Sequence, residues 1–118
     1  MLDGCVGWPP DFVDRYRGAG YWQPRTLGEL ARHEARHNGD RLALAGSNCR
    51  LTYRALDAAA DRVAAGLYRL GIGPRDRVVI QLPNVPQFVV VALALFRLGA
   101  VPVFVLPAHR RNEIQFLC

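Results

Sequence analysis

Lysine is missing from this sequence altogether. Its 118 residues include fifteen basic side chains, and every one of them is an arginine. This absence excludes chemistry that needs an ε-amine within these residues, such as a Schiff base or the lysine of a phosphate-binding loop. The arginines are spread from Arg15 to Arg111, usually beside acidic residues, and do not form the basic patch of a nucleic-acid surface. We therefore expect no nucleic-acid partner.

Cysteine is scarce as well. The three cysteines, Cys5, Cys49 and Cys118, are odd in number and widely spaced, which argues against a disulfide framework and against a CxxC metal or redox site. Reduced thiols indicate a cytoplasmic location. The first ten residues also lack the basic start and apolar stretch of a signal peptide.

A membrane-spanning segment is not expected either. Residues 88–106 contain Arg97 as their only charged residue, and a spanning helix needs about twenty apolar residues. Gly99 and Pro102 interrupt the stretch, so we expect a helix followed by a strand and no membrane partner.

What is present is typical of a packed globular protein, since 51% of the residues are hydrophobic. Residues 1–25 are expected to form an aromatic N-terminal arm with a short helix at 11–17. Residues 26–118 are expected to form the incomplete start of a larger subdomain. In this second part, Thr26 should cap a helix that runs to His37, with Leu27, Leu30 and Ala31 on its inner face. A small hairpin should follow, formed by residues 41–45 and 49–51 with a turn at 46–48.

The next helix should be capped by Thr52 and end at Gly71. Its apolar positions recur with helical spacing at Leu56, Ala60, Val63, Leu67 and Leu70. A strand at 77–82, a helix capped by Asn84 that ends at Leu98, and a strand at 101–106 then form a βαβ unit.

These patterns predict an α/β fold. The helix that ends at Leu98 is apolar nearly all round and should be buried on every face, as should the two strands of a parallel sheet. The present residues cannot supply that cover, so we expect a truncated or partial chain. The last helix is expected at 111–118.

One local pattern has catalytic potential. His33, Glu34 and His37 fit H-E-x-x-H, which places two imidazoles one helical turn apart, able to bind zinc, with a glutamate as general base. The nearby Arg32 and Arg36 disfavour a metal, and the helix ends directly after His37. Candidates for a third ligand are Asp57, Asp61 and Glu113. We favour a solvated surface turn and assign no metal ligand.

A weaker pattern is His109-Arg110-Arg111, which follows a strand end and could bind an anion, because binding crevices lie at the carboxyl ends of parallel strands. A solvated turn before a helix is the favoured interpretation. Gly71-Ile72-Gly73 is no dinucleotide fingerprint, since it follows a helix and lacks the third glycine. We assign no catalytic residue and no cofactor-binding residue.

The order of several motifs resembles the N-terminal region of adenylate-forming enzymes. The motifs are Leu51-Thr52-Tyr53, Gly71-Ile72-Gly73-Pro74, Asp76-Arg77-Val78, Gln81-Leu82-Pro83-Asn84 and Gly99-Ala100-Val101-Pro102-Val103. Further motifs resemble the aryl-acid branch, the 2,3-dihydroxybenzoate–AMP and salicylate–AMP ligases of siderophore biosynthesis. These are Trp8-Pro9, Gly20-Tyr21-Trp22 and Leu106-Pro107-Ala108-His109-Arg110 with Glu113.

The resemblance implies a ligase that uses ATP and magnesium to form an aryl adenylate. The aryl group then passes to the phosphopantetheine thiol of an aryl carrier protein. The family's phosphate loop, aryl pocket, ribose-binding aspartate and catalytic lysine do not map onto these residues, so we expect the 118-residue chain alone to be inactive. Two alternatives stay open: a small independent α/β interaction module, and a disfavoured zinc hydrolase that uses His33, Glu34 and His37.

Overall fold

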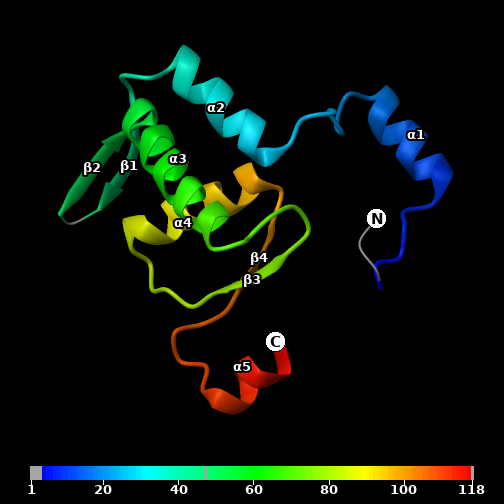
Figure 1. Ribbon diagram of the computed structural model, residues 1–118. Coiled ribbons are helices and arrows are strands. Elements are labelled where there is room, and N and C mark those ends of the chain that lie inside the picture. Colours follow the sequence, from blue (N-terminus) through cyan, green and yellow to red (C-terminus); the bar gives the residue numbers. More distant parts are fainter. Residues whose placement is uncertain (1–3, 47, 118) are drawn as a thin grey trace.

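A computed structural model describes residues 4–46 and 48–117 of the chain. The elements follow one another as α1 (Pro10–Gly18), α2 (Leu27–His37), β1 (Leu42–Gly46), β2 (Cys49–Thr52), α3 (Tyr53–Arg69), β3 (Arg77–Ile80), α4 (Pro86–Leu98), β4 (Val101–Phe104) and α5 (Arg111–Leu117) (Figure 1). β1 and β2 form an antiparallel hairpin, and β3 and β4 form a parallel pair. The predicted α/β fold class is confirmed.

Helix α2 begins at the predicted cap. The Thr26 hydroxyl accepts a hydrogen bond from the Glu29 backbone N–H (3.2 Å), and the Glu29 carboxylate accepts one from the Thr26 backbone N–H (2.7 Å). The pair satisfies two of the donors that the start of a helix leaves free. The helix ends at His37, as predicted.

The buried face of α2 differs from the prediction. Leu27 and Leu30 are 56% and 45% exposed, whereas Gly28 and Ala35 are buried. A Cβ on Gly28 would lie only 3.1 Å from the Cα of Arg97, so α2 approaches α4 through this glycine. α2 therefore approaches α4 at a small residue. Leu27 and Leu30 line a hollow among α2, α3 and α4 instead.

The hairpin lies where it was predicted. Leu42 pairs with Thr52 and Gly46 pairs with Cys49, with an irregularity between Leu42 and Leu44. Of the predicted turn at 46–48, Ser47 lies outside the described residues.

Helix α3 confirms most of its predicted pattern. The Thr52 hydroxyl accepts from the Ala55 backbone N–H (3.2 Å), and Leu56 and Ala60 are buried. Val63 and Leu67 are half-buried, and Ala64, which was not predicted, is buried too.

At the end of α3, the prediction for Leu70 is wrong, because this side chain is 80% exposed. The helix ends at Arg69, and Gly71 turns the chain with a φ of 91°. Leu70 thus lies past the last helical residue, where the periodicity of the buried face no longer applies.

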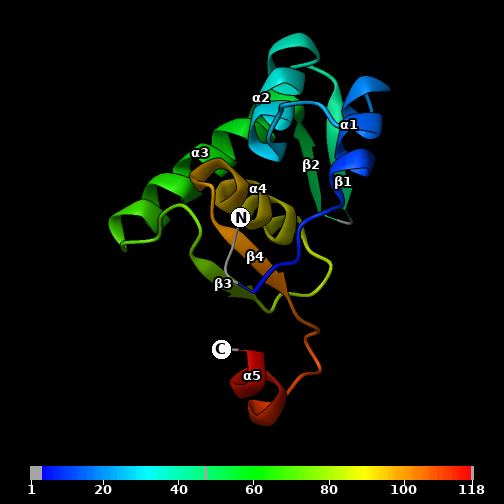
Figure 2. The ribbon, with the colours of Figure 1, turned by 90° about the vertical axis from the view of Figure 1, so that its right-hand side faces the viewer.

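The β3–α4–β4 segment is the predicted βαβ unit. β3 and β4 are in parallel register, from Arg77 beside Val101 to Ile80 beside Phe104. α4 connects them and lies against α3 and α2 (Figures 1 and 2). Residues of this unit form the core cluster, namely Ile80, Ala92, Leu95 and Ala100.

One expectation about α4 is wrong. Val85, not Asn84, stands at the cap position, without a side-chain hydrogen bond, because a residue before proline is held in an extended conformation and the helix starts only at Pro86. The described residues cover the faces of α4 only in part, in line with the expectation that these residues cannot supply full cover. Ala92, Ala94 and Leu95 are buried, most of the other positions are half-buried and Gln87 is exposed.

The strands are similarly uncovered in part. Phe104 and Leu106 are 51% and 63% exposed, so the described residues leave apolar surface at this sheet open. No helix of the described residues is long and apolar enough to span a membrane. The predicted helix and strand within residues 88–106 are confirmed as α4 and β4.

Both ends of the described chain stand away from the central helices (Figures 1 and 2). α1 carries no buried residue. Aromatic rings in and beside it contact one another, with centroid distances of 5.4 Å between Tyr16 and Trp22 and 5.8 Å between Trp8 and Trp22. α5 confirms the last predicted helix up to Leu117, and Cys118 lies outside the described residues. The division of the chain at residue 25 stays a prediction.

Candidate functional site

The H-E-x-x-H motif lies on the last turns of α2. The rings of His33 and His37 stack with their centroids 4.0 Å apart. The His37 Nδ1–H donates a hydrogen bond to the backbone carbonyl of His33 (2.8 Å). This bond stabilises the end of the helix and leaves only Nε2 of His37 for another partner.

Glu34 is not placed as a general base between these histidines. Its carboxylate accepts a hydrogen bond from the Asn38 side chain (2.7 Å), and this bond is the main cause that lowers the pKa of Glu34. A lowered pKa makes a carboxylate a weaker base at neutral pH.

The candidates for a third metal ligand lie elsewhere. Asp57 and Asp61 are bonded to Arg97, and Glu113 accepts the backbone N–H of Arg110 (2.9 Å). Among residues 4–46 and 48–117, no group of three His, Cys, Asp or Glu side chains could hold a metal ion. The structure therefore gives the zinc hypothesis no support.

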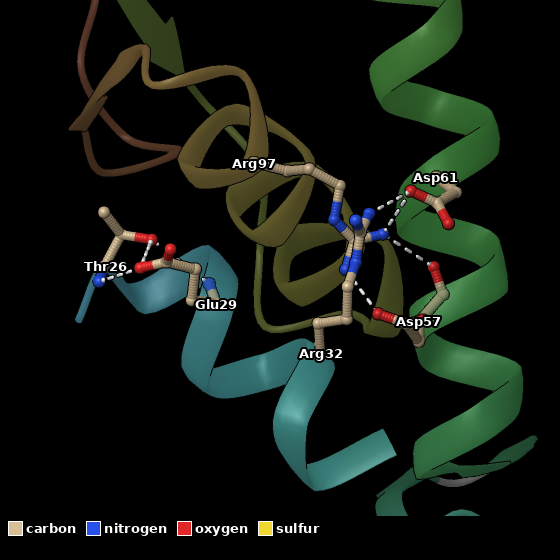
Figure 3. Close-up of polar contacts among 6 residues, drawn as sticks. All are labelled: Thr26, Glu29, Arg32, Asp57, Asp61 and Arg97. Atoms are coloured by element: carbon tan, nitrogen blue, oxygen red, sulfur yellow. Dashed lines mark hydrogen bonds and ion pairs between the residues drawn. The ribbon is translucent and has the colours of Figure 1, made fainter. Parts of the chain in front are cut away.

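The strongest polar cluster joins α2, α3 and α4 around Arg97, whose side chain is only 10% exposed. The guanidinium donates to the carboxylate of Asp57, to the Asp57 backbone carbonyl (3.0 Å) and to the carboxylate of Asp61 (2.6 Å) (Figure 3). Arg32 of α2 also forms an ion pair with Asp61 of α3 (3.0 Å). We call these four residues the Arg97 cluster.

Sequence reasoning missed the Arg97 cluster because it treated arginines as surface cations. One signal could have revealed it, since Arg97 is the only charged residue in the apolar stretch 88–106. A buried charge in such a stretch needs partners, and Asp57 and Asp61 lie one turn apart on α3.

The carboxyl edge of the β3–β4 pair holds the other predicted candidate, His109-Arg110-Arg111. Gln81, just past β3, donates its side-chain amide to the carbonyls of Leu106 (3.2 Å) and His109 (2.8 Å) and so fastens the segment after β4.

An anion is not favoured at this edge. The Glu113 carboxylate already accepts the backbone N–H of Arg110 at the start of α5, and the hydrogen bonds from the backbone of Glu113 and Arg110 lower the pKa of Glu113. A negative charge thus already occupies the position that an anion would take. The sequence analysis named Gln81 within the family-like motif Gln81-Leu82-Pro83-Asn84 but gave it no role, since no pattern of charge or spacing marks its contacts.

Among the described residues, the contacts around Arg97 thus form a polar cluster that joins three helices. Comparison with known proteins shows which family this chain is similar to. Residues 31–118 match the family described as AMP-binding enzyme. A 2,3-dihydroxybenzoate-AMP ligase of Bacillus subtilis is 50% identical over 118 residues, which is all of this chain and 22% of that protein.

Two further proteins are similar over nearly the whole chain. A Mycobacterium tuberculosis protein named salicyl-AMP ligase / salicyl-S-ArCP synthetase is 49% identical over 96% of this chain and 21% of its own length. The apo structure of MbtA from Mycobacterium smegmatis is 44% identical, with a TM-score of 0.92 over 97% of this chain and 22% of that chain.

The chain thus spans about a fifth of the length of these relatives. The family match covers its α2 to α5 region, and the structural match covers nearly all of its fold. The resemblance seen in the sequence is confirmed, and the chain belongs to the AMP-binding enzyme family.

Proposed function

We propose that this chain forms the N-terminal part of an ATP-dependent ligase that activates a hydroxylated aryl acid for siderophore biosynthesis. One observation carries the proposal: the similarity to a 2,3-dihydroxybenzoate-AMP ligase extends over all 118 residues, from the aromatic arm to the last helix. The protein named for salicyl-AMP synthesis is nearly as similar, so the proposed substrate class is an aryl carboxylic acid with a hydroxyl group beside the carboxyl.

The proposed reaction has two steps. The aryl carboxylate attacks the α-phosphorus of ATP, which forms aryl-AMP and releases pyrophosphate. The thiol of a carrier-protein phosphopantetheine then attacks the acyl carbon, which forms the aryl thioester and releases AMP. We place the enzyme in the cytoplasm, where ATP is available and thiols such as Cys5 and Cys49, unpaired in the structure, stay reduced.

The proposed contribution of this chain is structural. Magnesium would neutralise phosphate charge in such a reaction, but the described residues hold no cluster of metal-binding side chains, and the chain has no lysine for phosphate contacts. We therefore assign no step to these residues. The β3–α4–β4 unit, held to α2 and α3 by the Arg97 cluster, supports a sheet that further polypeptide completes.

The test is ATP–pyrophosphate exchange by the polypeptide that the gene carrying this sequence encodes. Salicylate, 2,3-dihydroxybenzoate, benzoate and a fatty acid are compared as substrates. We expect exchange that depends on one of the two hydroxylated acids, and none from the 118-residue chain alone. Exchange driven best by the fatty acid would refute the proposed substrate class, and exchange by the 118-residue chain alone would refute its structural role.

A further inference from the structure

A shallow hollow of about 360 Å³ lies along α2 on the side that carries the histidine pair. Six residues that line it carry the argument: Arg25, Glu29, Arg32, His33, Arg36 and His37. We call this the α2 hollow. It is a different space from the apolar hollow among α2, α3 and α4.

The α2 hollow has an excess of positive charge. Three guanidinium groups face one carboxylate, and that carboxylate, Glu29, is already held by the backbone and the hydroxyl of Thr26. These two bonds, followed by the charge of Arg25, lower the pKa of Glu29, so the group is engaged at the helix start. It does not neutralise the arginines farther along α2.

Most of the guanidinium donors remain available. Arg25 and Arg36 are exposed, and neither forms an ion pair with any residue in the described part of the chain. Arg32 uses its Nη2 group for Asp61. Arg32 and Arg36 also stand one turn apart, so their like charges repel each other.

The same charges explain why the H-E-x-x-H pattern does not suit a metal. A cation at the histidines would be repelled by the guanidinium groups of the α2 hollow. An oxyanion would be attracted, and arginine forks match phosphate oxygens with two parallel hydrogen bonds. The stacked imidazoles form part of the wall of this hollow.

We propose that the α2 hollow binds phosphate groups, at a site formed by Arg25, Arg32 and Arg36. The ligand chemistry is a phosphate or diphosphate oxyanion, either inorganic or carried by a nucleotide. This inference goes beyond the proposed ligase function and does not depend on it, because each contact comes from residues of this chain.

The test is calorimetric titration of the polypeptide that the gene carrying this sequence encodes, with inorganic pyrophosphate and, in parallel, with AMP. The decisive variant combines Arg25→Gln and Arg36→Gln, two exposed positions whose change leaves the Arg97 cluster intact. The matched control combines Arg50→Gln and Arg111→Gln, which remove the same charge at exposed positions outside the hollow.

We expect saturable pyrophosphate binding that weakens at least about tenfold in the Arg25/Arg36 variant and less than about twofold in the control, because only the former loses charge-assisted hydrogen bonds. AMP binding that is lost in the same variant would support the site with a nucleotide as its source. Absence of saturable binding, or equal weakening in both variants, would overturn the proposal.

Discussion

Arg97 is a charged residue at the centre of the contacts among α2, α3 and α4. It stands near the end of an apolar helix, is 10% exposed, and reaches two aspartates of α3. Gly28 of α2 packs against its backbone, so α2 and α3 both meet α4 at this residue. The cluster thus lies where the three helices meet.

Replacing Arg97 by methionine should lower the free energy of unfolding by about 2–3 kcal/mol, because the change leaves the half-buried Asp57 without its partner. The magnitude is reduced because Asp61 is 53% exposed and can be hydrated. Urea denaturation measures the effect. Arg50→Met, at an exposed position of β2, is the control and should change stability by less than about 0.5 kcal/mol. Equal effects of both substitutions would contradict a structural role for the cluster.

Gly39 is a second residue with a specific structural requirement. A Cβ there would lie 2.7 Å from the carbonyl oxygen of Ala35 and 2.9 Å from the Arg54 side chain. The Gly39 carbonyl also accepts the Arg54 backbone N–H (3.0 Å) at the start of α3, which limits how far the segment can move.

Gly39→Ala should therefore destabilise the chain by about 1–3 kcal/mol, as overpacking does elsewhere. Gly66→Ala provides the opposite case, because a Cβ at this position of α3 meets nothing within 4 Å. Alanine in a helix is favoured over glycine by up to about 1 kcal/mol, so Gly66→Ala should stabilise. Thermal unfolding of the two variants should shift in opposite directions, and a shift in the same direction would show that packing at Gly39 was misjudged.

At the scale of helices and strands, local chemistry made most of the fold predictable. Thr26 and Thr52 are caps because their hydroxyls accept backbone N–H groups three residues on, and Gly71 and Gly99 end helices with positive φ. The wrong predictions concern side chains whose burial depends on contacts with neighbouring elements. Sequence spacing pointed to the leucines of α2 as its buried face, but α4 selected the side with Gly28.

The capping box of α2 predicts a specific dependence on pH. Hydrogen bonds from the backbone and hydroxyl of Thr26 lower the pKa of Glu29 from its ordinary 4.5 in the folded state. The ionised form is therefore favoured by folding. Its contribution to stability is present above pH 4.5 and is lost as the pH falls through the lowered folded pKa.

The comparison that isolates this effect is wild type against Glu29→Gln, since glutamine can accept the same hydrogen bonds and does not titrate. The stability of wild type relative to this variant should fall as the pH drops below 4.5. Urea denaturation over a series of pH values measures it. A difference that stays constant, or grows in favour of wild type in acid, would contradict the assigned cap.

At the scale of the whole molecule, the main feature is apolar surface that the fold of the described residues leaves exposed. Phe104 and Leu106 beside the parallel strands, and Leu27 on α2, are more than half exposed. The sequence indicated this shortage of cover, because a single βαβ unit cannot bury its own apolar faces. Which of these side chains stay exposed depends on long-range packing, which local patterns do not encode.

The candidate sites were less predictable than the fold. The H-E-x-x-H spacing was correct as helix geometry, yet Asp57 and Asp61, two candidates for a third ligand, are paired with Arg97 instead. Such contacts join residues far apart in the sequence. The family resemblance succeeded because it rests on the order of many motifs along the chain.

The most direct test of the account is a chimera. The segment of the Bacillus subtilis 2,3-dihydroxybenzoate-AMP ligase that aligns with this chain, at 50% identity over 118 residues, is replaced by this chain, and ATP–pyrophosphate exchange is measured with 2,3-dihydroxybenzoate. The account predicts a folded chimera with substrate-dependent exchange, and weakened thermal stability when Arg97→Met is added. A chimera that fails to fold, or that folds and shows no exchange, would contradict the claim that this chain is the scaffold of an aryl-acid adenylating enzyme.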